Sequence, residues 1–91
     1  MMTNRQLAKV SDPRKFPLCR VTWVDSASTR GWNTLEEIRK DHRPVECETV
    51  GYLVVRSRRM LSLVQSVSEF GRAAETISIP ASCVRKVRKL K

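Results

Sequence analysis

The sequence predicts a mainly β protein with one short helix, built as a small curled barrel of five strands. Five short segments are rich in β-branched residues and alternate apolar with polar positions, which is typical of half-buried strands. Gly51 interrupts one of these segments and indicates a bend or a bulge. The alternative architecture is an open antiparallel sheet with one helix.

The first predicted strand covers residues 20–27. Its alternation places Val21, Trp23 and Asp25 on one face, and its β-branched and aromatic content supports the assignment. A run of small polar residues follows and indicates a loop.

The helix is predicted over residues 34–42. Thr34 and Glu37 form a capping box, and Leu35 and Ile38 give a narrow apolar stripe. Because a helix this short is marginal alone, we expect the sheet to hold it in place.

The next two strands form a hairpin, with strands over 47–57 and 60–69 and a basic turn over 56–59. In the second strand, Gln65 shares a face with Leu61 and Leu63. A buried amide without a hydrogen-bond partner costs about 1–3 kcal/mol, so Gln65 is expected to contact a ligand or the backbone.

The last part of the chain is a turn over 70–75, a strand over 76–79, a single 3₁₀ turn and a final strand over 84–90. At the other end, residues 1–18 are polar and basic and are interpreted as a tail or irregular arm. This division leaves residues 19–91 as the barrel domain.

The charge balance predicts anionic partners. The chain has 18 Lys and Arg against 9 Asp and Glu, a formal net charge of +9. Nucleic acid, nucleotides or an acidic surface would complement it. The excess is concentrated at the two ends and in the hairpin turn.

The sequence predicts no cofactor, no metal site and no enzyme activity. The three cysteines lack paired spacing and His42 is the only histidine, which does not fit structural zinc. There is also no Walker-type phosphate loop. Free thiols and the lack of a signal peptide or membrane span favour a soluble, cytoplasmic protein.

The polar run between Trp23 and Trp32 is the first candidate site. A nucleotide needs a flat ring for its base and donors for its phosphate. We expect Trp23 mainly to hold the core and Trp32 to face a ligand, with Arg30 and the Ser26, Ser28 and Thr29 hydroxyls beside it. The full set of predicted ligand-binding residues is Asp25, Ser26, Ser28, Arg30, Trp32, Tyr52, Arg58, Arg59, Gln65 and Ser66.

Two resemblances add to this interpretation. The segment around Ile79 and Pro80, together with the hairpin before it, resembles the C-terminal part of SH3-like and Sm-like barrels. This resemblance covers residues 47–90. Residues 21–90 are similar to small, mostly uncharacterised bacteriophage proteins. The shared pattern is Trp-x-Asp-Ser, Gly-Trp, Val-Gly-Tyr, Gln-Ser and Ile-Pro, here at Trp23, Asp25, Ser26, Gly31, Trp32, Val50, Gly51, Tyr52, Gln65, Ser66, Ile79 and Pro80.

The phage resemblance implies a function in counter-defence. Several small phage proteins are oligomeric sponges for the cyclic nucleotide signals of bacterial immunity. We therefore expect a homo-oligomer in the host bacterial cytosol that sequesters such a signal, with stacking on Trp32 or Tyr52 and phosphate contacts from Arg30, Arg58 and Arg59. The alternatives are an Sm-like RNA- or DNA-binding module and a protein inhibitor that docks on a host enzyme.

Overall fold

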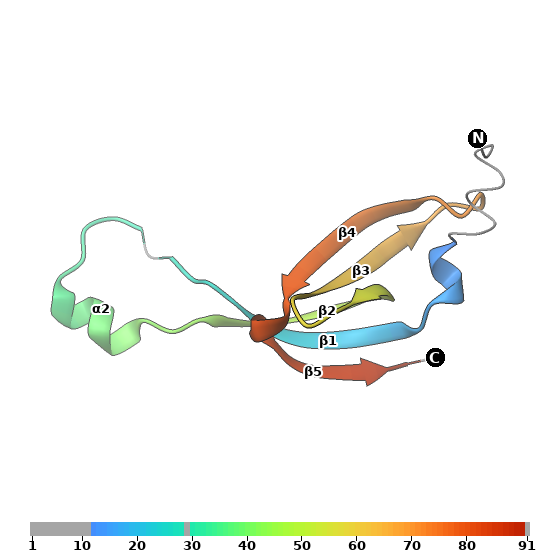
Figure 1. Cartoon of the computed structure of the whole chain (residues 1–91). Coiled ribbons are helices and arrows are strands. Elements are labelled where there is room, and N and C mark those ends of the chain that lie inside the picture. Colours follow the sequence, from blue (N-terminus) through green and yellow to red (C-terminus); the bar gives the residue numbers. More distant parts are fainter. Residues whose placement is uncertain (1–11, 29, 91) are drawn as a thin grey trace.

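The computed structural model describes residues 12–28 and 30–90, whose scaffold is one five-stranded antiparallel sheet with the strand order β4-β3-β2-β1-β5 (Figure 1). Its strands are β1 (Leu18–Asp25), β2 (Val45–Arg56), β3 (Met60–Val67), β4 (Ala73–Pro80) and β5 (Val84–Lys89). The other elements are the 3₁₀ turns η1 (Pro13–Lys15) and η2 (Ala81–Cys83) and the helix α2 (Leu35–Asp41). The predicted mainly β fold with one short helix is confirmed. Among the described residues β4 and β5 are the two edges of the sheet and do not pair, so the sheet is open rather than closed.

One core lies against the concave side of the sheet and draws on every strand. Its buried members are Cys19, Val21, Leu53, Leu61, Leu63 and Ile79. Both edge strands contribute, because Ile77 of β4 and Val87 of β5 pack against the same cluster. The sheet therefore curls around a shared core although its edges do not meet.

Gly51 has a different role from the predicted bend or bulge. It pairs with Cys19 in the regular β1–β2 register, and the irregularity of β2 falls between Leu53 and Val55. A Cβ atom on Gly51 would lie 2.7 Å from the carbonyl oxygen of Val64. Glycine is needed here because the backbone of β3 approaches too closely for any side chain.

Three strands begin earlier than predicted, among them β2, which begins at Val45. β1 begins at Leu18, and β4 begins at Ala73, within the predicted turn. Ala73 and Ala74 have low β-propensity, but they pair with Val67 and Ser66 across the ladder. The turn shortens to residues 68–72, where the Ser68 amide donates to the Arg72 carbonyl at 2.9 Å.

The described part of the predicted N-terminal tail packs on the sheet. Pro13 is buried, and the Leu53 amide donates to the Pro17 carbonyl at 2.9 Å. The Asp12 carboxylate caps η1 by accepting from the Arg14 amide at 2.9 Å, and it pairs with the Arg14 guanidinium at 2.6 Å. These hydrogen bonds lower the pKa of Asp12 to about 2. Residues 1–11 of the predicted tail lie outside the described residues.

Residues 26–44, here called the arm, leave the sheet between β1 and β2 (Figure 1). The two strands stay paired as far as Asp25 and Val45, and the arm then carries α2 away from the core. Every α2 side chain that is described is exposed, so the prediction that the sheet holds the helix is wrong. In residues 12–28 and 30–90, no helix has the length and apolar character needed to cross a membrane.

Candidate functional site

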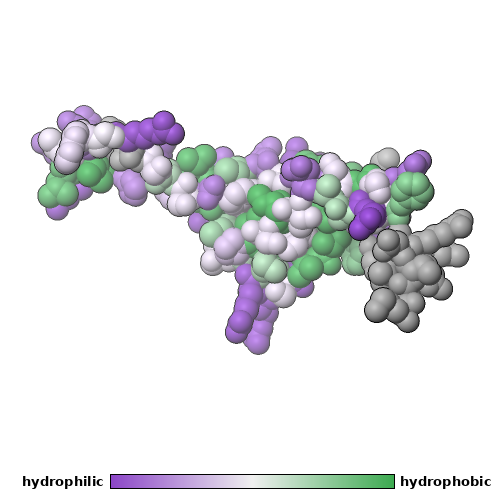
Figure 2. Space-filling view, turned by 90° about the horizontal axis from the view of Figure 1, so that it is seen from above, coloured by the Kyte–Doolittle hydropathy of each residue, from purple (hydrophilic) through white to green (hydrophobic). Residues whose placement is uncertain are grey.

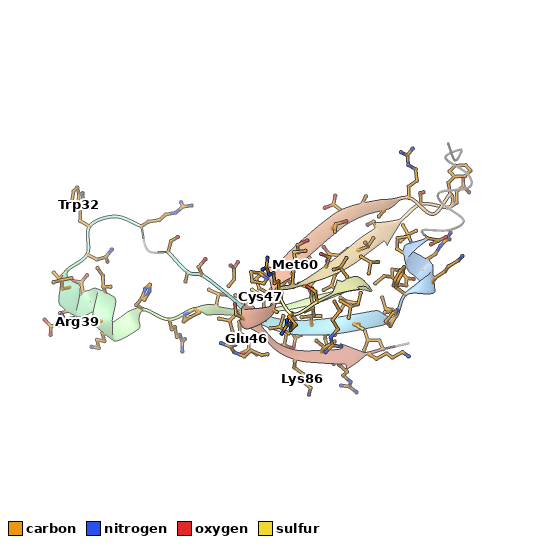
Figure 3. All side chains as sticks on the ribbon, viewed as in Figure 1. Trp32, Arg39, Glu46, Cys47, Met60 and Lys86 are labelled. Carbon is orange, nitrogen blue, oxygen red and sulfur yellow. The ribbon has the colours of Figure 1, made fainter. Side chains whose placement is uncertain are left out.

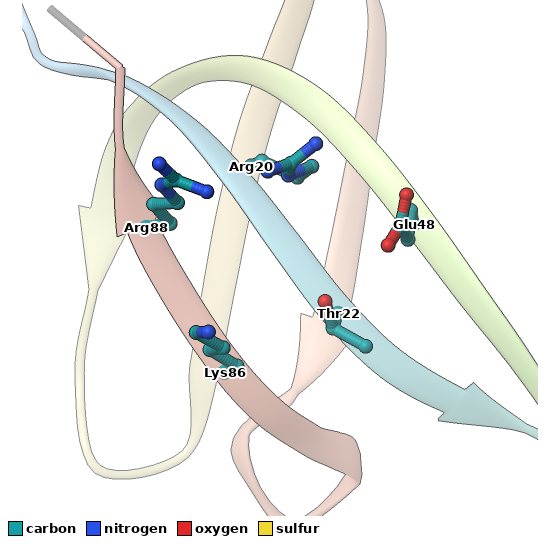
Figure 4. A pocket seen from close by; sticks show the side chains of 5 residues that line it. All are labelled: Arg20, Thr22, Glu48, Lys86 and Arg88. Carbon is teal, nitrogen blue, oxygen red and sulfur yellow. The ribbon is translucent and has the colours of Figure 1, made fainter.

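A basic cavity lies on the convex, outward side of the sheet. Arg20 and Thr22 of β1, Glu48 of β2, and Lys86 and Arg88 of β5 line it, and its volume is about 80 Å³ (Figure 4). Strand alternation produces this arrangement, because the intervening residues Cys19 and Val21 point into the core. We call these five residues the basic face.

The strand register places like charges opposite one another. Arg20 pairs with Arg88 across the β1–β5 ladder, and Thr22 pairs with Lys86. Like charges directly opposite in a sheet are destabilising. In the described part of the chain, Arg20, Lys86 and Arg88 form no ion pair, although Glu48 also lines the cavity. The three cations are therefore available to an external anion.

The size of the cavity limits what it can take. Pockets that enclose a small-molecule ligand have volumes of about 300–1,000 Å³, so 80 Å³ does not enclose a nucleoside. A phosphate-sized oxyanion is a better match, because Arg20 and Arg88 offer forked N–H donors. The Glu48 carboxylate can accept hydrogen bonds from a sugar hydroxyl or a base amine of the same ligand.

A second basic group stands at the tip of the β2–β3 hairpin. Arg58 and Arg59 are exposed there, and the Ser57 hydroxyl accepts from the Met60 amide at 3.1 Å. The Ala81 amide donates to the Arg59 carbonyl at 2.8 Å. This bond ties the tip to η2, so that Arg58 and Arg59 lie beside the beginning of β5.

The predicted residues around Trp32 lie on the arm, apart from the basic face (Figure 3). Ser26, Ser28, Arg30 and Trp32 are exposed, and Trp32 is fully so. Thr29 lies outside the described residues. The Asp25 carboxylate at the arm's root accepts from the Ser26 amide at 2.8 Å, as expected of a loop cap.

Trp23 belongs to the core, as predicted. Its ring packs against the buried cluster, and its indole Nε1 donates to the Thr49 hydroxyl at 3.0 Å. Thr49 is itself buried, so the bond satisfies two polar groups at once. The two tryptophans thus have separate environments, one packed and one in solvent.

The remaining predicted residues form a third group on β2 and β3. Tyr52 is half-buried and pairs with Leu18 and Val64. Gln65 and Ser66 are exposed on β3. The premise that Gln65 is a buried amide is therefore wrong, so its side chain can be hydrated and does not require a partner in the protein. The structure does not bring the arm group, the hairpin tip and these residues together in one chain.

Sequence reasoning missed the basic face as a unit. It noted the concentration of basic residues at the C-terminal end but did not place them against Arg20. The pairing of Arg20 with Arg88 depends on the β1–β5 register, which joins residues far apart in the sequence. The available signal was local: in β1, Arg20 and Thr22 alternate with apolar Cys19, Val21 and Trp23.

The chain matches no protein-family model, and no curated protein and no solved structure is significantly similar to it. The function is therefore argued from the surface itself. Two features of the described residues bear on function: the three cations of the basic face, which form no ion pair there, and the arm, whose helix is exposed.

Proposed function

We propose that the protein is a nucleic-acid-binding module whose basic face contacts the phosphate backbone. The observation that carries the proposal is the Arg20–Arg88 cross-strand pair with Lys86 beside it, because none of the three forms an ion pair with another described residue. Sheets are stabilised by opposite charges at such positions. An arrangement that costs stability and leaves cations free fits a surface for an external anion.

A polymer fits this surface better than a single enclosed nucleotide. The cavity accommodates one phosphate-sized group, and the hairpin tip offers Arg58 and Arg59 beside the start of β5. Lys86 and Arg88 continue the positive charge along β5. Successive phosphates of a nucleic acid can contact such separated cations, and the net charge of +9 favours their approach.

We further infer that the curled sheet is an SH3-like or Sm-like barrel. The order β4-β3-β2-β1-β5, the 3₁₀ turn between β4 and β5, and the core shared by both edges support this inference. Folds of this kind serve many functions, so the fold agrees with nucleic-acid binding without deciding it.

Sequestration of a cyclic nucleotide in the host bacterial cytosol is a second proposal, favoured by one observation. Trp32 is fully exposed on the arm, and Arg30 stands two positions before it. A ring and a guanidinium of this kind suit a base and a phosphate. In this proposal, a second chain would supply the other wall of the site.

The test is fluorescence-anisotropy titration of the full chain with labelled single-stranded RNA, single-stranded DNA and duplex DNA of equal length, over a range of NaCl concentrations. For a single strand held by three phosphate contacts, the plot of log affinity against log salt has a slope of about −2. Arg20→Ser should weaken binding and make this slope shallower by nearly one unit.

The matched control is Arg72→Ser, which removes the same charge from the exposed 68–72 turn outside the basic face. It should change affinity much less than Arg20→Ser does. Equal losses of affinity in the two variants would mean that binding depends only on net charge. An affinity that does not change with salt concentration would contradict the proposal. Tight binding of a cyclic dinucleotide without oligonucleotide binding would favour the second proposal.

A further inference from the structure

The arm carries an apolar stripe that nothing in the described chain covers. Trp32 is fully exposed, Leu35 is 70% exposed and Ile38 is 36% exposed. Figure 2 shows apolar residues at the end of the arm, separated from the body of the sheet. The stripe consists of Leu35 and Ile38, which lie three residues apart and therefore on one side of α2, and of Trp32 on the loop just before the helix.

The helix lacks the support that a helix of its length needs. Isolated helices shorter than about 12 residues are marginal in water, and α2 spans Leu35–Asp41. One N-terminal hydrogen bond is provided, since the Glu37 amide donates to the Thr34 hydroxyl at 3.2 Å. The remaining stabilisation has to come from burial of the apolar stripe, and the chain's own sheet does not provide it.

We propose that α2 of a second copy of this chain covers the stripe, with the two helices antiparallel across a two-fold axis. The charges of the helix support this occupant and this orientation. Glu36 and Glu37 lie in the first turn, and Arg39 and Lys40 lie in the last turn. An antiparallel pair places the acidic turn of each helix beside the basic turn of the other, and it also opposes their dipoles.

A two-fold contact would also bury the apolar residues of both copies. In such an interface the same patch is used by both copies, so each stripe is covered by an identical stripe. A nucleic acid is a poorer occupant, because Glu36 and Glu37 repel phosphates and the aliphatic side chains of Leu35 and Ile38 offer them no donors. The arm holds the interface away from the basic face, so a dimer would present two basic faces.

The interface is small, and its affinity should be modest. Three apolar side chains per copy correspond to the low end of specific interfaces, below about 1,200 Å² of buried surface. We therefore expect a dimer whose population depends on protein concentration. The inference concerns assembly alone, so its failure would leave the proposed nucleic-acid binding untouched.

Sedimentation equilibrium of the full chain over a range of concentrations tests the assembly. The average mass should rise from 10.5 kDa towards twice that value. Leu35→Ser with Ile38→Ser should raise the dissociation constant about tenfold or more, because buried anchors carry most of the affinity of an interface. Phe70→Ser is the control, since Phe70 is 71% exposed but lies on the opposite hairpin turn.

Charge reversal tests the antiparallel orientation. A Glu36→Lys/Glu37→Lys variant and an Arg39→Glu/Lys40→Glu variant should each dimerise more weakly than the original chain, because each then opposes like charges. An equimolar mixture of the two variants should recover dimerisation. Circular dichroism and thermal melting should show that the sheet persists in each.

Three results would overturn the proposal. The first is a chain that stays monomeric at all concentrations, including one that in this state binds another protein through the arm. The second is a dimer indifferent to the Leu35 and Ile38 substitutions. The third is a mixture of charge-reversed variants that associates no better than its components.

Discussion

The sheet and the arm use apolar residues in opposite ways. In the sheet, alternation buries Val21, Leu63 and Ile79 almost completely. In the arm, a narrow amphipathic pattern leaves Leu35 and Ile38 in solvent. A periodic pattern therefore identifies the face that an element will bury, but it does not say whether the covering surface belongs to the same chain.

The two regions differ in charge as well. On the basic face, Arg20, Lys86 and Arg88 gather from two strands without an ion pair among the described residues. On the arm, the acidic residues lie in the first turn of α2 and the basic residues lie in its last turn. The first arrangement suits a polyanion, and the second suits a copy of itself.

The largest expected difference is between two leucines. Leu63→Ala should lower the free energy of unfolding by about 2–5 kcal/mol, because it removes a fully buried side chain from the core. Leu35→Ala should change the stability of the monomer by no more than about 0.5 kcal/mol. Urea denaturation at low protein concentration measures both. A similar loss in the two variants would mean that the arm packs on the sheet.

Substitutions of the two tryptophans should differ less in their effect on the free energy of unfolding. Trp23→Phe removes the hydrogen bond to Thr49 and part of the packing, so we expect a loss of about 1–3 kcal/mol. Trp32→Phe should leave the melting temperature unchanged. Fluorescence separates them further: in the Trp32→Phe variant the emission of Trp23 should be blue-shifted, whereas in the Trp23→Phe variant the emission of Trp32 should be that of a solvated indole. Equal spectra would contradict this division.

The smallest expected effect is a weaker docking of η1 on the sheet at acidic pH. The folded-state pKa of Asp12 is lowered to about 2 by its hydrogen bonds with Arg14, below its ordinary value of 3.8. A lowered pKa gives stability that is fully present above the unfolded pKa and lost as pH falls towards the folded one. The docking of η1 should therefore weaken between about pH 4 and pH 2.

Amide hydrogen exchange at Leu53, which donates to Pro17, reports this docking. Asp12→Asn should remove most of the pH dependence of its protection in that window. The Ala81 amide, which donates to the Arg59 carbonyl at the opposite end of the sheet from η1 (Figure 1), is the reference. Unchanged pH dependence in the variant would assign the acid response to other carboxylates.

Much of the fold follows from local patterns, and the rest depends on contacts between distant residues. The Thr34 cap sets the start of α2 at Leu35, and alternation places Val21 and Leu63 in the core. The role of Gly51 depends on how closely β3 passes, which no neighbouring residue reveals. For the same reason, Arg20 could not be joined to Arg88 before the register of β1 and β5 was known.

The predicted site shows the same limit. Sequence reasoning correctly separated a core Trp23 from an exposed Trp32, because Trp23 alternates within a strand and Trp32 follows a loop glycine. It grouped Tyr52 and Gln65 with the arm because ligand chemistry connected them, and the structure places them on other strands. The residue types indicated the ligand chemistry, but only the three-dimensional structure showed which of these residues lie near one another.

The most direct test of the basic face combines stability with binding in one variant, Arg88→Glu. This change places a carboxylate opposite Arg20, so we expect the melting temperature to rise or stay constant while the affinity for oligonucleotides falls. Arg72→Glu, with the same change in net charge outside the cavity, should reduce affinity much less. Undiminished affinity of Arg88→Glu for oligonucleotides would contradict the central claim that this face binds phosphates.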